Sequence, residues 1–125
     1  MANILVIEDN PANMKLAVLI LESHGHIAIS AENAIDGIQQ AKERLPDLIL
    51  MDIQLPDMDG LEATQLLKQD PKTKDIPVFA MTAFAMRGDE ERILNAGCDG
   101  YIKKPIQYKH FLETITMALH VSRPE

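Results

Sequence analysis

Acidic residues come directly after two short apolar runs of this sequence. Glu8 and Asp9 follow the run Ile-Leu-Val-Ile, and Asp52 follows the run Leu-Ile-Leu-Met. Clustered carboxylates repel one another unless a cation lies among them, and Mg²⁺ prefers octahedral oxygen ligation that includes one or two protein carboxylates. If the two runs end side by side, Asp9 and Asp52 would be direct ligands of Mg²⁺, and Glu8 would act through a water molecule.

Asp52 is also the candidate nucleophile. A carboxylate beside a metal ion can attack a phosphoryl group and form an acyl phosphate. Asp52 follows a stiff apolar run, whereas Asp57 and Asp59 lie in the turn-rich stretch Leu-Pro-Asp-Met-Asp-Gly and are expected to be mobile. Asp52 is preferred because the reacting group has to be held in place.

A hydroxyl and an ammonium group follow two further apolar runs. Thr82 comes after residues 77–81, and Lys104 comes shortly after residues 100–102. Lys104 would pair with a phosphoryl oxygen as a point charge, and the Thr82 hydroxyl would donate to another oxygen. Lys103 is expected to be an ordinary surface lysine. Phosphoryl transfer in such a site needs positioning and charge neutralisation more than covalent assistance.

Each of these residues also has a purely structural interpretation. An Asp after a strand often caps a helix, and Glu8 and Asp9 could favour the positive end of the helix that follows them. Thr82 could cap a loop, and Lys104 could be a surface lysine in a chain with a formal net charge of −7. It is their occurrence together, after corresponding strands, that favours the functional interpretation.

The apolar runs before these residues are typical of parallel strands. They lack alternation of polar and apolar residues, as expected for strands that are covered on both faces. The predicted strands are residues 3–7, 27–30, 48–51, 77–81 and 100–102.

Segments with helical spacing lie between the predicted strands. The first has Asn10 as N-cap and Pro11 in its first turn and ends at Gly25, and the others are residues 34–45, 61–68, 87–96 and 108–119. The alternation predicts an α/β fold, a doubly wound five-stranded parallel sheet with helices on both faces. In such sheets ligands bind beyond the carboxyl ends of the strands, where the residues above would collect.

Composition is that of a soluble globular domain and argues against several functions. The chain has 125 residues, which fit one domain, with 46% apolar and 25% charged residues. Its acidity and lack of clustered Lys and Arg argue against direct nucleic-acid binding. Without an export signal or an apolar run of about 18 residues, a cytoplasmic protein without membrane contact is expected. Cys98 permits no internal disulfide, and no role is assigned to His24, His26, His110 and His120.

Four motifs resemble the receiver domains of two-component signalling. They are Ile-Glu-Asp-Asn, Leu-Ile-Leu-Met-Asp with Pro56 and Gly60 downstream, Met-Thr-Ala, and Lys-Lys-Pro, and the resemblance covers residues 3 to about 119. Two stretches, Met-Asp-Ile-Gln-Leu-Pro and Thr-Ala-Phe-Ala-Met-Arg-Gly-Asp-Glu-Glu-Arg, are especially similar to DivK-type single-domain regulators and to the receivers of hybrid histidine kinases. The resemblance implies a flavodoxin-like (CheY-like) (βα)5 fold with strand order 2-1-3-4-5. Residues 1–125 would form a single receiver domain without an output domain.

The resemblance also implies how the acidic residues act. Asp52 would be phosphorylated by a phosphohistidine on a histidine kinase or a histidine phosphotransfer protein. Glu8, Asp9 and the backbone carbonyl of Gln54 would hold Mg²⁺ together with Asp52. Many relatives have Asp at the position of Glu8, and either residue can act through a water molecule.

The remaining matching residues would form a switch. Thr82 would move toward the phosphoryl group, Tyr101 would turn inward behind it, and Lys104 would pair with it. The peptide bond before Pro105 is expected to be cis. The surface that changes would be the fourth helix, fifth strand and fifth helix, where a downstream effector protein or a kinase would bind.

Two other functions fit part of the pattern. A small Mg²⁺-dependent phosphohydrolase could use the same aspartyl-phosphate chemistry, but haloacid-dehalogenase-type phosphatases usually carry a second Asp two residues after the nucleophile, where this chain has Gln54. An FMN binder fits the sheet but not the carboxylates, and no Gly-rich phosphate loop is present. A signalling switch rather than an enzyme is therefore expected, with Gln54 and Phe84 flanking the site, where they could influence water access.

Overall fold

The computed structural model describes residues 2–83 and 87–121, which form a parallel sheet between two layers of helices. The strands are β1 (Asn3–Ile7), β2 (Ile27–Ala31), β3 (Leu48–Asp52), β4 (Val78–Thr82) and β5 (Gly100–Lys103). All neighbours pair in parallel, in the order β2-β1-β3-β4-β5. The predicted fold class and strand order are confirmed. Some strand boundaries differ by one residue from the prediction. Asp52, Thr82 and Lys103 are the last residues of β3, β4 and β5 rather than residues after them, β2 extends to Ala31, and β4 begins at Val78.

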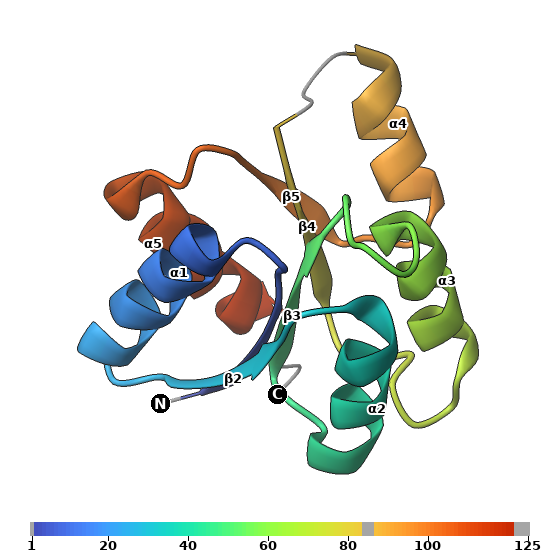
Figure 1. The fold of residues 1–125 in the computed structure, drawn as a ribbon, viewed down its shortest axis with the longest axis horizontal. Coiled ribbons are helices and arrows are strands. Elements are labelled where there is room, and N and C mark those ends of the chain that lie inside the picture. The colour runs from blue at the N-terminus through green and yellow to red at the C-terminus, as the bar shows by residue number, and fades with distance from the viewer. Residues whose placement is uncertain (1, 84–86, 122–125) are drawn as a thin grey trace.

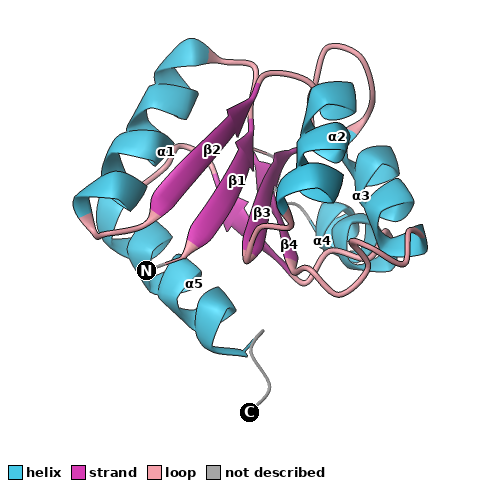
Figure 2. Ribbon diagram, turned by 90° about the horizontal axis from the view of Figure 1, so that it is seen from below, coloured by secondary structure: helices cyan, strands magenta, loops and turns pink. Residues whose placement is uncertain are grey.

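Helices cover both faces of the sheet. They are α1 (Pro11–Ser23), α2 (Ala34–Arg44), α3 (Gly60–Gln69), α4 (Arg87–Asn95) and α5 (Tyr108–Val121). Figures 1 and 2 show α1 and α5 together on one side of the sheet and α2, α3 and α4 on the other. Among the described residues, none of these helices has the length and apolar character needed to cross a bilayer.

Two apolar cores, one on each face, hold the sheet between the helices. Because successive side chains of a strand point to opposite faces, Ile4 and Val6 of β1 join the core under α1 and α5, whereas Leu5 and Ile7 join the core under α2, α3 and α4. Every residue of β3 is buried, and burial of each large aliphatic side chain contributes about 1.5–3 kcal/mol. β3 is therefore a rigid support for Asp52, its last residue.

The ends of α1 agree with the sequence signals. The Asn10 side chain accepts hydrogen bonds from the backbone N–H groups of Ala12 and Asn13, at 2.9 and 3.1 Å, as an N-cap does. The helix ends at Ser23, and the chain then turns at Gly25, whose φ of +84° favours glycine. These local signals place Glu8 and Asp9 in the short connection between β1 and α1.

The loop between β3 and α3 differs from the expectation, because Asp57 and Asp59 have fixed partners. The two carboxylate oxygens of Asp57 accept hydrogen bonds from the N–H groups of Ala34 and Ile35, at 2.8 and 2.9 Å, which caps α2 from a distant part of the chain. Asp59 caps α3 by accepting from the N–H of Leu61. The unpaired N–H groups and positive dipole of a helix N-terminus attract carboxylates. The loop is thereby tied to α2 as well as to α3.

Gly60 packs against the end of β3. Its N–H donates to the carbonyl of Ile53 at 2.8 Å, and a Cβ at this position would lie 2.2 Å from the carbonyl oxygen of Asp52. A contact this short with backbone cannot be relieved by rotating a side chain. A residue without a Cβ is therefore required where the loop returns beside Asp52.

Gly60→Ala is expected to lower the free energy of unfolding by about 1–3 kcal/mol, because the added methyl group forces the loop away from β3. Chemical denaturation measures this change. Gly88→Ala is the matched control, since a Cβ at Gly88 meets no atom within 4 Å. Alanine in that helical position should leave stability unchanged or raise it by up to about 1 kcal/mol. Equal effects of the two substitutions would contradict the packing argument.

Candidate functional site

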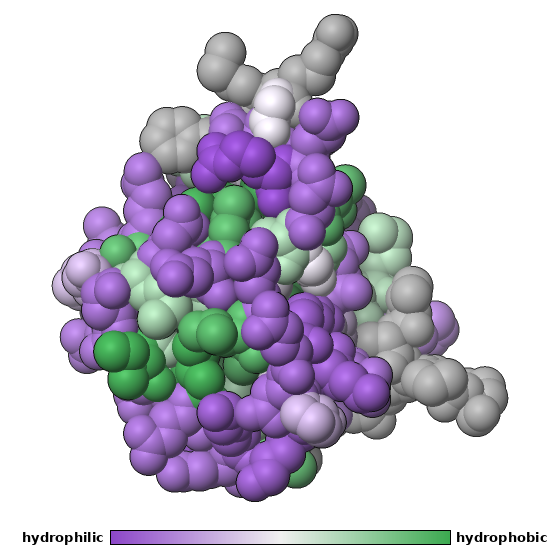
Figure 3. Space-filling model, turned by 90° about the vertical axis from the view of Figure 1, so that its right-hand side faces the viewer, coloured by the Kyte–Doolittle hydropathy of each residue, from purple (hydrophilic) through white to green (hydrophobic). Residues whose placement is uncertain are grey.

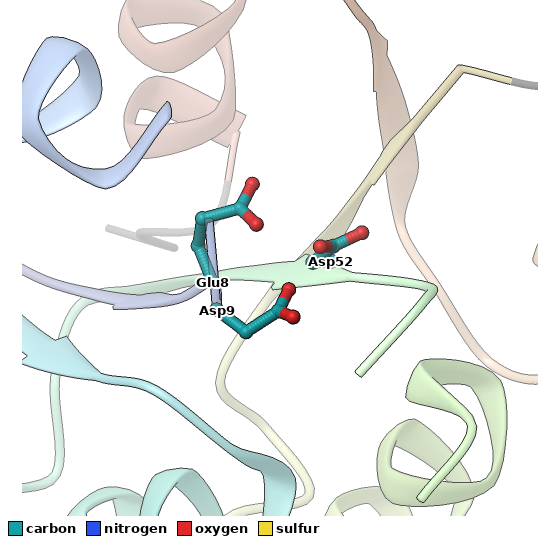
Figure 4. Close-up of side chains that lie close together, drawn as sticks. All are labelled: Glu8, Asp9 and Asp52. Atoms are coloured by element: carbon teal, nitrogen blue, oxygen red, sulfur yellow. The ribbon is translucent and has the colours of Figure 1, made fainter. Parts of the chain in front are cut away.

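The carboxyl ends of β1 and β3 bring three carboxylates together. β1 and β3 are neighbours, and their register places Ile7 opposite Met51, so that the residues after them meet at one edge of the sheet. Glu8, Asp9 and Asp52 each offer an oxygen that lies within 4.8 Å of the other two (Figure 4). Glu8 and Asp52 are buried, with 1% and 4% of their surface exposed, whereas Asp9 is exposed.

Lys104 supplies a positive charge to this acidic group. Its Nζ lies 2.8 Å from Glu8 Oε1 and 3.3 Å from Asp52 Oδ2, and only 16% of its side chain is exposed. The backbone N–H of Lys104 donates to the carbonyl of Thr82 at 2.7 Å, which fixes the start of the loop after β5. The Lys104–Pro105 bond is cis, as expected. Lys103 is exposed, so the two adjacent lysines have different surroundings.

The pKa values of the two buried carboxylates are shifted in opposite directions. Burial, followed by the nearby Glu8 carboxylate, raises the pKa of Asp52 to about 7, against the lowering effect of the Gln54 N–H, which donates to Asp52 Oδ1 at 3.1 Å. Burial also opposes ionisation of Glu8, but Asp52, Lys104 and the N–H of Asn10 together lower the pKa of Glu8. Of the two buried carboxylates, Asp52 is therefore the one that holds a proton more readily in the metal-free protein.

The donor set fits a hard divalent cation. Apart from its ion pair with Lys104, Glu8 Oε1 is buried without a hydrogen-bond partner. All three side chains offer carboxylate oxygens, and within residues 2–83 and 87–121 no other group of three acidic, His or Cys side chains lies close enough to share an ion. Oxygen-only ligation with an exposed position beside Asp9 favours Mg²⁺ over softer metals.

Thr82 and Tyr101 lie on the neighbouring strands β4 and β5. Thr82 is buried at the end of β4, beside the strand that carries Asp52. Tyr101 lies on β5 opposite Ala80, and its hydroxyl donates to a carboxylate oxygen of Glu90 in α4. Sequence reasoning assigned no partner to Tyr101. Phe84, expected to flank the site, lies outside the described residues.

A cavity of about 470 Å³ opens beside the ends of β3 and β4. Its lining includes Gln54 and Thr82, and also Asp89 and Arg92 of α4, which form an ion pair at 3.0 Å. Because Gln54 lies two residues from Asp52, the cavity gives a reacting group room to approach this edge of the sheet.

Comparisons with known proteins agree with this geometry. The model of the response regulator receiver domain family matches residues 4–116. The polar-differentiation response regulator DivK of Brucella anthropi is 50% identical over 113 residues, which cover 90% of this chain and 92% of the relative. DivK of Brucella ovis matches with the same identity and coverage.

Solved receiver domains have the same fold. The receiver domain of a sensor histidine kinase from Pseudomonas aeruginosa PAO1, with a magnesium ion coordinated in its active site cleft, has a TM-score of 0.88 and 31% identity, covering 95% of this chain and 98% of that one. A CheY-like receiver domain protein from Methanospirillum hungatei JF-1 has a TM-score of 0.89 and 30% identity, covering 98% and 96%. Together with the relatives at half identity and a family match over most of the sequence, these likenesses show that the chain belongs to the response regulator receiver domains.

Proposed function

We propose that this receiver domain accepts a phosphoryl group on Asp52 from the phosphohistidine of a histidine kinase or a histidine phosphotransfer protein. The observation that carries the proposal is the position of Asp52, which ends a fully buried strand and shares its surroundings with two further carboxylates and one ammonium group. Asp57 and Asp59 are committed to helix caps. Asp52 is therefore the carboxylate placed to react.

The proposed transfer exchanges one bond for another. A carboxylate oxygen of Asp52 forms a bond to phosphorus while the phosphorus–nitrogen bond of the phosphohistidine breaks, and the imidazole leaves with the electron pair and takes up a proton. The N–H of Gln54 orients Asp52 through the hydrogen bond at 3.1 Å. Lys104, already 3.3 Å from Asp52, pairs with a phosphoryl oxygen, and the Thr82 hydroxyl donates to another.

The same proposal includes a magnesium site. Asp9, Asp52 and the backbone carbonyl of Gln54 would hold Mg²⁺ directly, and Glu8 would hold it through a water molecule. Two observations support this assignment: the buried Oε1 of Glu8 has Lys104 as its one partner among the described residues, and the three carboxylates approach one another closely. Bound Mg²⁺ supplies charge neutralisation at the phosphoryl oxygens.

Phosphorylation is proposed to act as a switch read by another protein. Thr82 and Tyr101 would move, and the surface of α4, β5 and α5 would change for a downstream effector or a kinase. The hydrogen bond from Tyr101 to Glu90 supports this, because it connects β5 to α4, two of the elements of that surface. A cytoplasmic location and output through partner proteins are part of the same proposal. A small Mg²⁺-dependent phosphohydrolase is not favoured, since the chain belongs to the receiver family.

Incubation with acetyl phosphate and Mg²⁺ is expected to add the mass of one phosphoryl group, detected by intact-protein mass spectrometry. Asp52→Asn should abolish the adduct, because the amide is not a nucleophile for this reaction, and excess chelator should abolish it in the unchanged protein. Asp57→Asn is the matched control and should be labelled normally. Labelling that persists in the Asp52→Asn variant would refute Asp52 as the acceptor, and steady turnover of several phosphate monoesters would favour the phosphohydrolase.

The free energy of unfolding of the metal-free protein is expected to fall as the pH rises from about 4 toward 7. The reason is that Asp52 has a pKa of about 7 in the folded protein, whereas in the unfolded chain it releases its proton near pH 3.8. Asp52→Asn removes this loss, so the variant should exceed the unchanged protein by on the order of 1–3 kcal/mol at pH 8, with a smaller difference at pH 5.

Denaturant unfolding in chelator at several pH values measures this difference. At pH 8, added Mg²⁺ should stabilise the unchanged protein more than the Asp52→Asn variant, because the ion binds the folded carboxylates. A stability difference that does not depend on pH would contradict the raised pKa of Asp52.

A further inference from the structure

Most of the described side chains of α4 are partly or fully exposed. Among residues 88–95, whose side chains the structure describes, Ile93 is the buried one. Figure 1 shows α4 at the outer end of its layer, and Figure 3, which views the molecule from that side, shows mostly hydrophilic side chains with smaller apolar groups between them. The position of such a helix therefore depends strongly on the few polar contacts that it makes with the sheet.

The contact between Glu90 and Tyr101 is a polar link of this kind. Tyr101 packs, partly buried, against the core under α2, α3 and α4, and its hydroxyl donates to Glu90 Oε1. This hydrogen bond, with burial as the second cause, raises the pKa of the Tyr101 phenol. A hydroxyl that donates to a carboxylate forms a charge-assisted bond, which is stronger than a neutral one.

The other acidic residues at the start of α4 make different contacts. Asp89 forms an ion pair with Arg92 at 3.0 Å, and Glu91 is exposed. Glu90 is therefore the member of this acidic run that the structure directs to β5. This difference provides matched positions for a test.

We propose that Glu90 is a positioning residue of the switch, which holds Tyr101 against α4 in the unphosphorylated protein and so opposes activation. The inference rests on the proposed function, since it assigns a regulator to the same switch. A contact made in one of two conformations stabilises that conformation, and the other can be populated only when the contact breaks. Inward rotation of Tyr101 would break the bond to Glu90 and release α4 together with it. Removing the Glu90 carboxylate would then favour the phosphorylated conformation in advance of phosphorylation.

Glu90→Ala in the full chain is expected to bind the phosphoryl analogue beryllofluoride, in the presence of Mg²⁺, roughly 3–10-fold more tightly than the unchanged protein, because one opposing hydrogen bond is lost. Calorimetric titration measures this affinity. Glu91→Ala removes the same charge from the neighbouring exposed position and should leave the affinity unchanged. Glu90→Gln, which keeps a neutral acceptor, should give an intermediate affinity.

A double-mutant cycle tests whether Glu90 acts through the Tyr101 hydroxyl. In a Tyr101→Phe background, Glu90→Ala should have no further effect on analogue affinity. As an independent readout, NMR titration should show a lower pKa of the Tyr101 phenol in Glu90→Ala than in the unchanged protein. Denaturation of each variant checks that it is folded, and Glu90→Gln serves in place of Glu90→Ala if the alanine variant is not.

Two outcomes would overturn the proposal without affecting the proposed function. One is an unchanged analogue affinity in both Glu90 variants while the unchanged protein binds the analogue and is phosphorylated on Asp52. The other is an equal effect of Glu90→Ala with Tyr and with Phe at position 101. If the unchanged protein neither binds the analogue nor accepts a phosphoryl group, the proposed function fails, and the switch role of Glu90 fails with it. The titration of the Tyr101 phenol would still show whether the contact with Glu90 forms.

Discussion

The pairing of buried Glu8 and Asp52 with Lys104 is the interaction on which this site depends. Two carboxylates this close and this deeply buried repel each other, and burial disfavours their charged forms. Lys104 lies within 2.8 and 3.3 Å of them and offsets part of this cost, and the raised pKa of Asp52, which favours its uncharged form, offsets a further part. Without a metal ion, the site therefore favours binding of additional positive charge, which is consistent with the proposed binding of a cation beside Asp52.

The scaffold keeps this unfavourable group of charges in place. β3 is buried along its whole length, so Asp52 has little freedom to move away from Glu8. Gly60 allows the following loop to return within contact of the Asp52 backbone, and Asp57 ties the same loop to the N-terminus of α2. The two apolar cores thus stabilise a fold in which the buried carboxylates repel each other. Shifted pKa values of this kind are common at functional sites.

The carboxyl end of β3 is fully buried, whereas most of the described side chains of α4 are exposed or partly exposed. That helix buries Ile93 and makes a polar contact with Tyr101 through Glu90, while its remaining described side chains are partly or fully exposed. A well-packed candidate site next to a largely exposed helix would favour the proposed switch, because moving the helix requires only a modest change in free energy.

The sequence alone determined the fold class, the strand order implied by its family resemblance and the residues at the carboxyl edge, because parallel strands, helix caps and strand-end motifs are local signals. Asn10 and the apolar runs are examples. The tertiary structure decided what depends on contacts between distant segments: that Asp57 caps α2 instead of being mobile, that Lys104 reaches both Glu8 and Asp52, and that Tyr101 donates to Glu90. No local pattern encodes these partners, since each pair meets only after the sheet and its crossover helices have packed.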